Sequence, residues 1–88
     1  MDHAQFLAHL QAQGFPAPME VTRLPVAFSD THTHDFTALI MVRAGTYTIA
    51  TADGQTAYAA GDVYTLEAGT AHAETAGPQG AELLISRR

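Results

Sequence analysis

Residues 36–66 read FTALIMVRAGTYTIATADGQTAYAAGDVYTL, and short runs of Val, Ile, Thr, Tyr and Phe alternate in them with turn residues. β-Branched and aromatic residues favour strands. Turns are predicted at Ala44-Gly45, Ala52-Asp53-Gly54 and Gly61-Asp62, because Gly and Asp tolerate the positive φ angles of tight turns. This stretch therefore predicts several short strands that follow one another as antiparallel neighbours.

The same texture of strands and turns extends from this stretch to Glu20 on one side and to Ser86 on the other. The predicted strands are Glu20–Leu24, Val26–Phe28, His32–His34, Phe36–Arg43, Thr46–Thr51, Gln55–Ala59, Val63–Leu66, Ala71–Thr75 and Glu82–Ser86. No helical segment long enough for a parallel crossover lies between them, which excludes a βαβ architecture. We therefore expect an all-β sandwich or barrel, in which closure removes exposed strand edges.

Residues 2–13 show a helical pattern. Phe6, Leu7 and Leu10 follow helical spacing, Asp2 is a good N-cap, and the sequence Gly-Phe-Pro-Ala-Pro at 14–18 ends the pattern. A chain of 88 residues is too short for two separate cores. We therefore expect residues 1–18 to form a helix and a proline-containing linker, in the same domain as a β-barrel of residues 19–88.

The composition restricts what the protein can bind. It has no lysine, four arginines and a formal net charge of −5 at pH 7, so we expect no nucleic-acid partner. Cysteine is absent, and any metal must therefore be held by nitrogen and oxygen ligands. Neither a long apolar run nor a basic amino-terminal region is present, which predicts no membrane span, no cleavable signal and a cytoplasmic location.

Three histidines form the clearest candidate site. His32 and His34 lie two residues apart in a β-prone segment, and the period of two places both imidazoles on one face of a strand. His72 follows a tight turn predicted at residues 67–70 and can fold back across a barrel toward them. Three imidazoles with open positions left over suit zinc, iron, nickel, manganese or copper. The alternative is that these histidines are hydrogen-bonded side chains that never bind metal.

Residues 26–87 resemble the cupin family. Its first motif is Gly, five residues, His-x-His, three or four residues, Glu, six residues, Gly. Its second motif is Gly, five residues, Pro, one residue, Gly, two residues, His, three residues, Asn. The matching residues of this chain are His32, His34, Gly45, Gly61, Gly69 and His72. The resemblance implies a small jelly-roll β-barrel with the three histidines as its metal ligands.

Four positions depart from the family pattern, since Val26, Ala38, Glu67 and Ala76 stand where the family has Gly, Glu, Pro and Asn. The change at Ala38 matters most, because a methyl group cannot bind a metal ion. The resemblance then implies either a three-histidine site, as in some dioxygenases of the family, or a site that another oxygen completes.

Glu74 is the acid that we expect inside the barrel. It lies two residues after His72 and shares its face on a regular strand, whereas Asp35 alternates away from His34 and is predicted at the surface. Glu74 is therefore the candidate catalytic acid or base, and the alternative is a solvent-facing acid at a strand end. The three tyrosines could lend a hydroxyl to the pocket, although aromatic residues in strands are more often core.

Together these features predict a metal-binding cupin-domain protein of undetermined activity, with one divalent transition metal in its barrel. One alternative is a small metal-dependent enzyme, a dioxygenase, isomerase or lyase, in which Glu74 or a tyrosine moves protons. Another is a metal-free barrel that binds or senses a small molecule. The small pocket that so short a chain can enclose argues against the enzyme.

A homodimer is the expected assembly. Residues 38–42 and 83–85 are consecutively apolar, so these strands carry apolar groups on both faces, and only one face can point into the barrel. A second subunit is the expected cover for the other face, since the helix offers only Phe6, Leu7 and Leu10. The alternative is that the helix covers this face itself and leaves a monomer.

Overall fold

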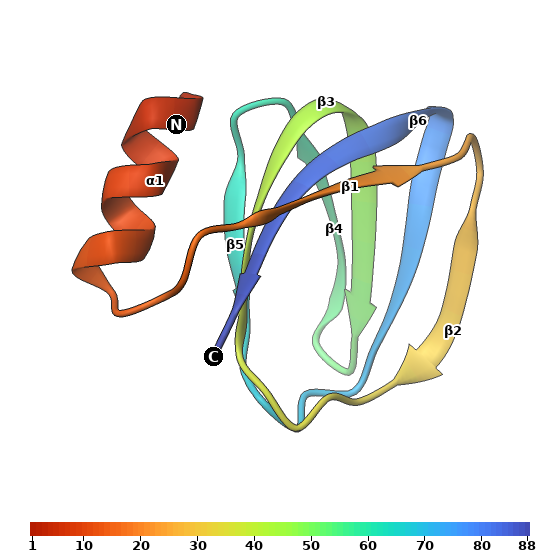
Figure 1. Cartoon of the computed structure of the whole chain (residues 1–88). Helices are drawn as coiled ribbons and strands as arrows, with labels where there is room; N and C mark the ends of the chain where they lie inside the picture. The colour runs from red at the N-terminus through yellow and green to blue at the C-terminus, as the bar shows by residue number, and fades with distance from the viewer.

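One helix and six strands make up the structure, a computed structural model that describes all 88 residues (Figure 1). The elements are α1 (His3–Ala12), β1 (Met19–Arg23), β2 (Phe28–His32), β3 (Ala38–Thr51), β4 (Gly54–Ala59), β5 (Val63–Leu66) and β6 (His72–Arg87). Helix α1 begins at the predicted N-cap, where Asp2 accepts a hydrogen bond from the Gln5 amide at 2.8 Å. This helix is too short to cross a membrane.

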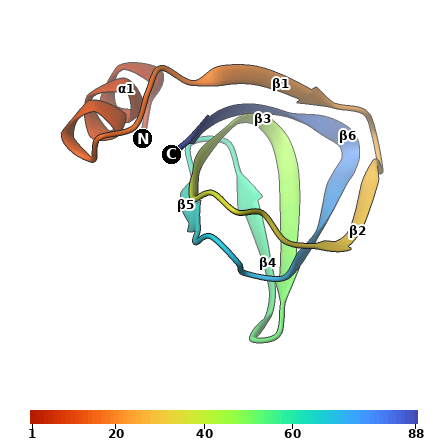
Figure 2. The ribbon, with the colours of Figure 1, turned by 60° about the horizontal axis from the view of Figure 1, so that its bottom comes forward.

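The strands form an antiparallel jelly-roll barrel around two long strands, β3 and β6 (Figure 2). The first half of β3 pairs with β5 and with the second half of β6, whose other neighbour is β1. The second half of β3 pairs with β4 and with the first half of β6, whose other neighbour is β2. β3 and β6 therefore run through both sheets of the barrel and join them. The predicted all-β class is confirmed.

The turn predicted at Ala44-Gly45 is wrong, because β3 continues through it. Register shifts between Val42 and Ala44, and between Gly45 and Tyr47, bulge the strand at this point. β6 likewise runs on where two strands, 71–75 and 82–86, were predicted. Bulges and glycines bend a strand without ending it. Glycine in this sequence therefore marks bends as well as turns.

The bend of β3 and β6 depends on glycine because three backbones meet there. A Cβ atom at Gly45 would overlap the carbonyl oxygen of Gly80, and one at Gly80 would lie 2.6 Å from the carbonyl oxygen of Arg23. Both glycines have positive φ angles, 74° and 79°. β1, β3 and β6 therefore approach one another more closely at this corner than a residue with a side chain allows.

Alternation along β3 divides its side chains between two cores. Ala38, Ile40 and Val42 face inward, and the other buried members of the barrel core are Tyr47, Ile49, Tyr64, Leu66, Ala76, Ala81 and Leu83. Leu39 and Met41 face outward and pack with Leu84 beneath Phe6 and Leu10 of α1.

Helix α1 therefore covers the apolar outer face that was expected to need a second subunit. Phe6 and Leu10 point inward as predicted, but Leu7 is exposed. Figure 1 shows the helix beside the sheet that contains β5. Because the chain supplies this cover itself, that face does not require a partner, and the homodimer stays a prediction.

Val26 is the one non-glycine residue with a positive φ angle, 53°. It lies in the turn between β1 and β2, so the predicted strand Val26–Phe28 is wrong except at Phe28, where β2 begins. A β-branched side chain in this left-handed region is strained. Glycine, which the cupin motif has at this position, would adopt this angle without strain.

Val26→Gly should raise the free energy of unfolding by roughly 0.5–1 kcal/mol, because relief of the left-handed strain exceeds the entropic cost of glycine. Little packing is lost, since Val26 is 68% exposed. Urea denaturation followed by circular dichroism measures the change. Thr22→Gly, at an exposed position of β1, is the control and should destabilise the protein. Equal destabilisation by the two substitutions would contradict the strain at Val26.

Candidate metal centre

His32, His34 and His72 come together at one end of the barrel. His32 ends β2, His72 begins β6 opposite it in the antiparallel register, and His34 lies in the link from β2 to β3. One ring nitrogen of each lies within 4.8 Å of the other two. The three predicted residues are therefore neighbours, although His34 reaches the others from a link and not from a strand.

Two links hold this end of the barrel in place. Residues 33–37 and 67–71 lie side by side at the bottom of Figure 1, and the Gly69 amide donates a hydrogen bond to the His34 carbonyl at 2.8 Å. The Thr37 hydroxyl accepts from the Ala68 amide at 3.2 Å. Gly69 has the positive φ angle, 82°, that the predicted tight turn requires. These bonds fix the backbone of His34 relative to the turn that precedes His72.

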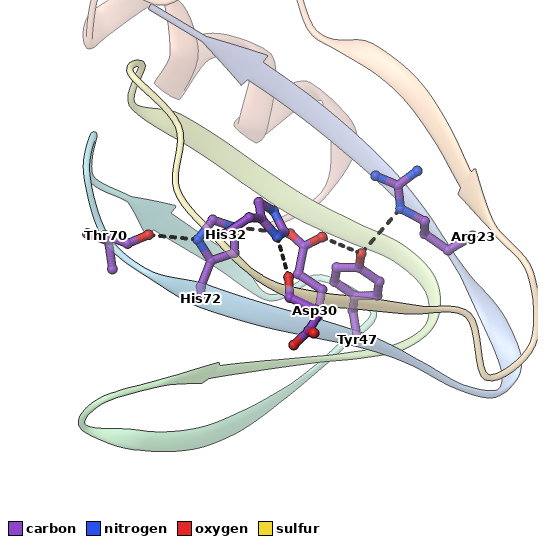
Figure 3. A network of polar contacts seen from close by, with 7 residues as sticks. Arg23, Asp30, His32, Tyr47, Thr70 and His72 are labelled. Carbon is purple, nitrogen blue, oxygen red and sulfur yellow. Dashed lines mark hydrogen bonds and ion pairs between the residues drawn. The ribbon is translucent and has the colours of Figure 1, made fainter.

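Backbone carbonyls set the tautomers of two histidines (Figure 3). Nδ1 of His32 lies 2.6 Å from the Asp30 carbonyl oxygen, and Nδ1 of His72 lies 2.8 Å from that of Thr70. Because a carbonyl only accepts, each Nδ1 carries a hydrogen, so that in the neutral imidazole each Nε2 has the lone pair. Nε2 of His72 is buried and has no hydrogen-bond partner. A buried, unpartnered lone pair of this kind fits a metal ion, as a metal-binding histidine donates its other nitrogen to a carbonyl.

The surroundings of His34 favour its neutral form. Burial lowers the pKa of His34, and positive charge on His32 or His72 lowers it further. Its ring stacks on Phe36 with centroids 4.6 Å apart. Two metal–nitrogen bonds of about 2.1 Å span at most about 4.2 Å, so the rings must draw together around an ion. His34, in a link, is placed to make this adjustment.

Glu74 lies inside the barrel beside the histidines, as its shared face with His72 predicted. Its Oε1 lies 3.6 Å from Nε2 of His72, and its Oε2 accepts a hydrogen bond from the Tyr47 hydroxyl at 3.1 Å. Nε of Arg23 donates to the same hydroxyl at 3.2 Å (Figure 3). A chain of polar contacts thus runs from β1 through β3 to the histidines. Asp35 is exposed, as predicted.

Sequence reasoning missed the link between Tyr47 and Arg23. Tyr47 is buried at 2% exposure, as expected of a core residue, but its hydroxyl also joins two charged groups. Arg23 has a signal in the sequence, because it alternates with Val21 on β1 and so shares its face. Because Val21 and Arg23 are two residues apart on a short strand, an inward-facing Val21 implies that Arg23 also faces the interior.

A cavity of about 300 Å³ adjoins the histidines. His32, His34 and Glu74 line it, and Ala38 lines it at the position where the family has its carboxylate ligand. A hollow of similar size, about 330 Å³, lies beside the β3–β4 hairpin but contains no histidine. The first cavity is therefore the candidate binding site, because it combines nitrogen donors, a carboxylate and apolar walls.

No family model and no curated protein matches the sequence. Solved structures do match. A cupin-2 domain containing protein from Shewanella frigidimarina has a TM-score of 0.64 and 23% identity over 78% of this chain and 64% of its own. A cupin superfamily protein from Desulfitobacterium hafniense has a TM-score of 0.68 and 18% identity over 76% of this chain and 61% of its own. The chain thus spans less than two thirds of either protein.

An oxalate decarboxylase from Lactobacillus farciminis, in a formate complex, has a TM-score of 0.68 and 25% identity. The match covers 82% of this chain but only 24% of the decarboxylase. These similarities establish the fold of the barrel and leave its chemistry to the residues described above.

Tyr47 and Tyr64 should resist ionisation until the protein unfolds. Burial raises the pKa of Tyr64 above its ordinary value of 10, helped by the negative charge of Glu74, and burial also raises the pKa of Tyr47. Because the unfolded chain loses these protons first, the stability they confer is fully present below pH 10 and is lost as pH rises above it. We expect tyrosinate absorbance from these residues to appear together with loss of the β-sheet circular dichroism signal. Tyr64→Phe should move this transition to higher pH, and full ionisation of all three tyrosines in a folded barrel would contradict the prediction.

Proposed function

The chain is a small cupin-fold protein, and we propose that it binds one divalent transition metal ion through His32, His34 and His72. The buried Nε2 of His72 carries the proposal, because an unpartnered buried polar atom costs about 1–3 kcal/mol. The nearby Glu74 oxygen, at 3.6 Å, is too far away to satisfy it by a hydrogen bond. A metal ion shared with the other two histidines would satisfy it.

A metal ion at this position would act as a Lewis acid toward water or a ligand in its open positions. Three neutral imidazoles without thiolate suit zinc, iron, nickel, manganese or copper. Glu74 is not one of the three clustered ligands, but it lies next to His72 and can accept a proton from a group bound there. Tyr47 acts as a positioning residue, because its hydroxyl donates a hydrogen bond to the Glu74 carboxylate, and Arg23 acts through it by donating to the same hydroxyl.

A small metal-dependent enzyme is the second candidate. Glu74 favours the enzyme, because its side chain is only 14% exposed and lines the cavity. It is therefore not the solvent-facing acid that was the alternative. Proton transfer beside an open metal position is the step that such a residue can supply. The oxalate decarboxylase from L. farciminis shares the fold, but its activity does not carry over to this chain on that ground.

His72→Ala should lower the affinity for Zn²⁺ by at least about 100-fold, because it removes one of three ligands. Isothermal titration of protein without a histidine tag should give one ion per chain for the natural sequence. His3→Ala, on the exposed surface of α1, is the matched control and should bind as well as the natural chain. Glu74→Gln should keep the stoichiometry and lose far less affinity than His72→Ala. Full binding by His72→Ala would show that the site is elsewhere.

Ala38→Glu should add a fourth protein ligand and tighten Zn²⁺ binding. Ala38 is buried and lines the cavity, so an added carboxylate without metal is costly and should lower the thermal midpoint of the metal-free protein. Zn²⁺ should then raise this midpoint by more than it raises that of the natural chain. Ala38→Gln, which adds similar bulk without charge, is the control. Unchanged Zn²⁺ affinity in a folded Ala38→Glu protein would mean that the first cupin motif is misaligned.

A further inference from the structure

We propose that the cavity beside the histidines binds a small organic carboxylate, and that Arg23 is the residue that holds the carboxylate. The inference rests on the proposed function in that it names the ligand class of the same site. It draws on residues other than the three histidines, however, and does not require the metal. Arg87, at the exposed edge of the cavity, would attract the anion.

Positive charge in this protein is scarce, and half of the arginines line this cavity. The chain has no lysine and a formal net charge of −5, so most of its surface repels anions. Of the four arginines, Arg23 and Arg87 line the cavity. The other two have partners elsewhere, since Arg43 pairs with Glu20 at 3.1 Å and Arg88 lies over the ring of Phe15.

Neither cavity arginine is neutralised. The structure contains one arginine ion pair, that of Arg43 with Glu20, and no ion pair involves Arg23 or Arg87. Arg23 uses only its Nε, which donates to the Tyr47 hydroxyl at 3.2 Å, so the outer nitrogens of its guanidinium are free. Arg87 lies 5.0 Å above the ring of Phe36, an uncharged partner. A guanidinium that faces a cavity with free N–H groups suits the two oxygens of a carboxylate.

Arg23 is held in place before any ligand arrives. It is half-buried on β1, and the Tyr47 side chain that orients it is itself 2% exposed. An arginine fixed in this way loses less side-chain entropy when it binds an anion than a free surface arginine does. Glu74 is the one acid that lines the cavity, and one of its oxygens is already bonded to Tyr47. Two positive charges and one negative leave the cavity positive.

The walls indicate that the anion carries an apolar body. Met19, Val21, Ile40 and Ile85 line the same cavity. Its volume of about 300 Å³ is the volume that about ten water molecules occupy in the liquid. An inorganic anion such as phosphate would leave these walls in contact with water, whereas a carboxylate with a compact hydrocarbon group would cover them. The cavity therefore fits an organic acid of modest size.

Calorimetric titration with matched acids and amides tests the inference. The probes are hexanoate, benzoate, phenylacetate and 3-phenylpropionate, each compared with its neutral amide, on metal-free and on Zn²⁺-loaded protein. At least one acid should bind tenfold or more tightly than its amide, because a charge-assisted hydrogen bond to arginine discriminates between them. Arg23→Gln should abolish this preference, and Arg23→Lys should restore part of it.

Two variants separate local binding from general electrostatics. Arg43→Gln changes the net charge equally but lies outside the cavity, so it should keep the preference for the acid. Arg87→Gln should weaken acid binding less than Arg23→Gln does, and its effect should shrink with added salt. Absence of any preference, or the same loss in Arg43→Gln, would overturn the inference. If the protein binds Zn²⁺ but shows no preference for the acids, the metal proposal stands and the carboxylate proposal is wrong. If it prefers the acids but binds no metal, the carboxylate proposal stands and the metal proposal is wrong.

Discussion

The close crossing of β1, β3 and β6 at Gly45 and Gly80 is the constraint on which the rest of the structure depends. The backbone carbonyl of Gly80 occupies the space that a side chain at Gly45 would need. The backbone carbonyl of Arg23 likewise occupies the space that a side chain at Gly80 would need. This crossing lets two long strands pass from one sheet into the other, so that a chain of 88 residues closes a barrel. Closure then places His32 of β2 opposite His72 of β6. The same crossing sets Arg23 on the wall of the cavity.

Sequence patterns predicted the side chains of the site better than the strands that carry them. The period of two put Glu74 on the face of His72, and the spacing of the cupin motifs brought His32, His34 and His72 together. The inference about Glu74 holds because alternation is a local property of a strand, whereas His34 lies in a link and was placed by the motif spacing alone. The bends at Gly45 and Gly80 could not be read in this way, since a glycine that reverses the chain and one that bends it look alike in sequence. What distinguishes them is a backbone that arrives from a distant part of the chain.

The polar chain behind Glu74 also depends on tertiary structure. Arg23 and Tyr47 are 24 residues apart, and their contact exists only because β1 and β3 border the same interior. The helix gives a second example. Phe6 and Leu10 were identified correctly as a surface cover and Leu7 was not, and only the fold shows that the first two reach Leu39, Met41 and Leu84. On this face the chain supplies its own apolar cover.

The two ends of the barrel differ in how their backbone is held. At the end with the glycine crossing, main chain packs against main chain, and a change of side chain has no room. At the histidine end, which Figure 1 shows on the opposite side, two links bonded through the Gly69 amide and the Thr37 hydroxyl carry or flank the functional residues. The glycine crossing thus holds the path of the long strands, and the opposite end carries the side chains that we propose bind a ligand.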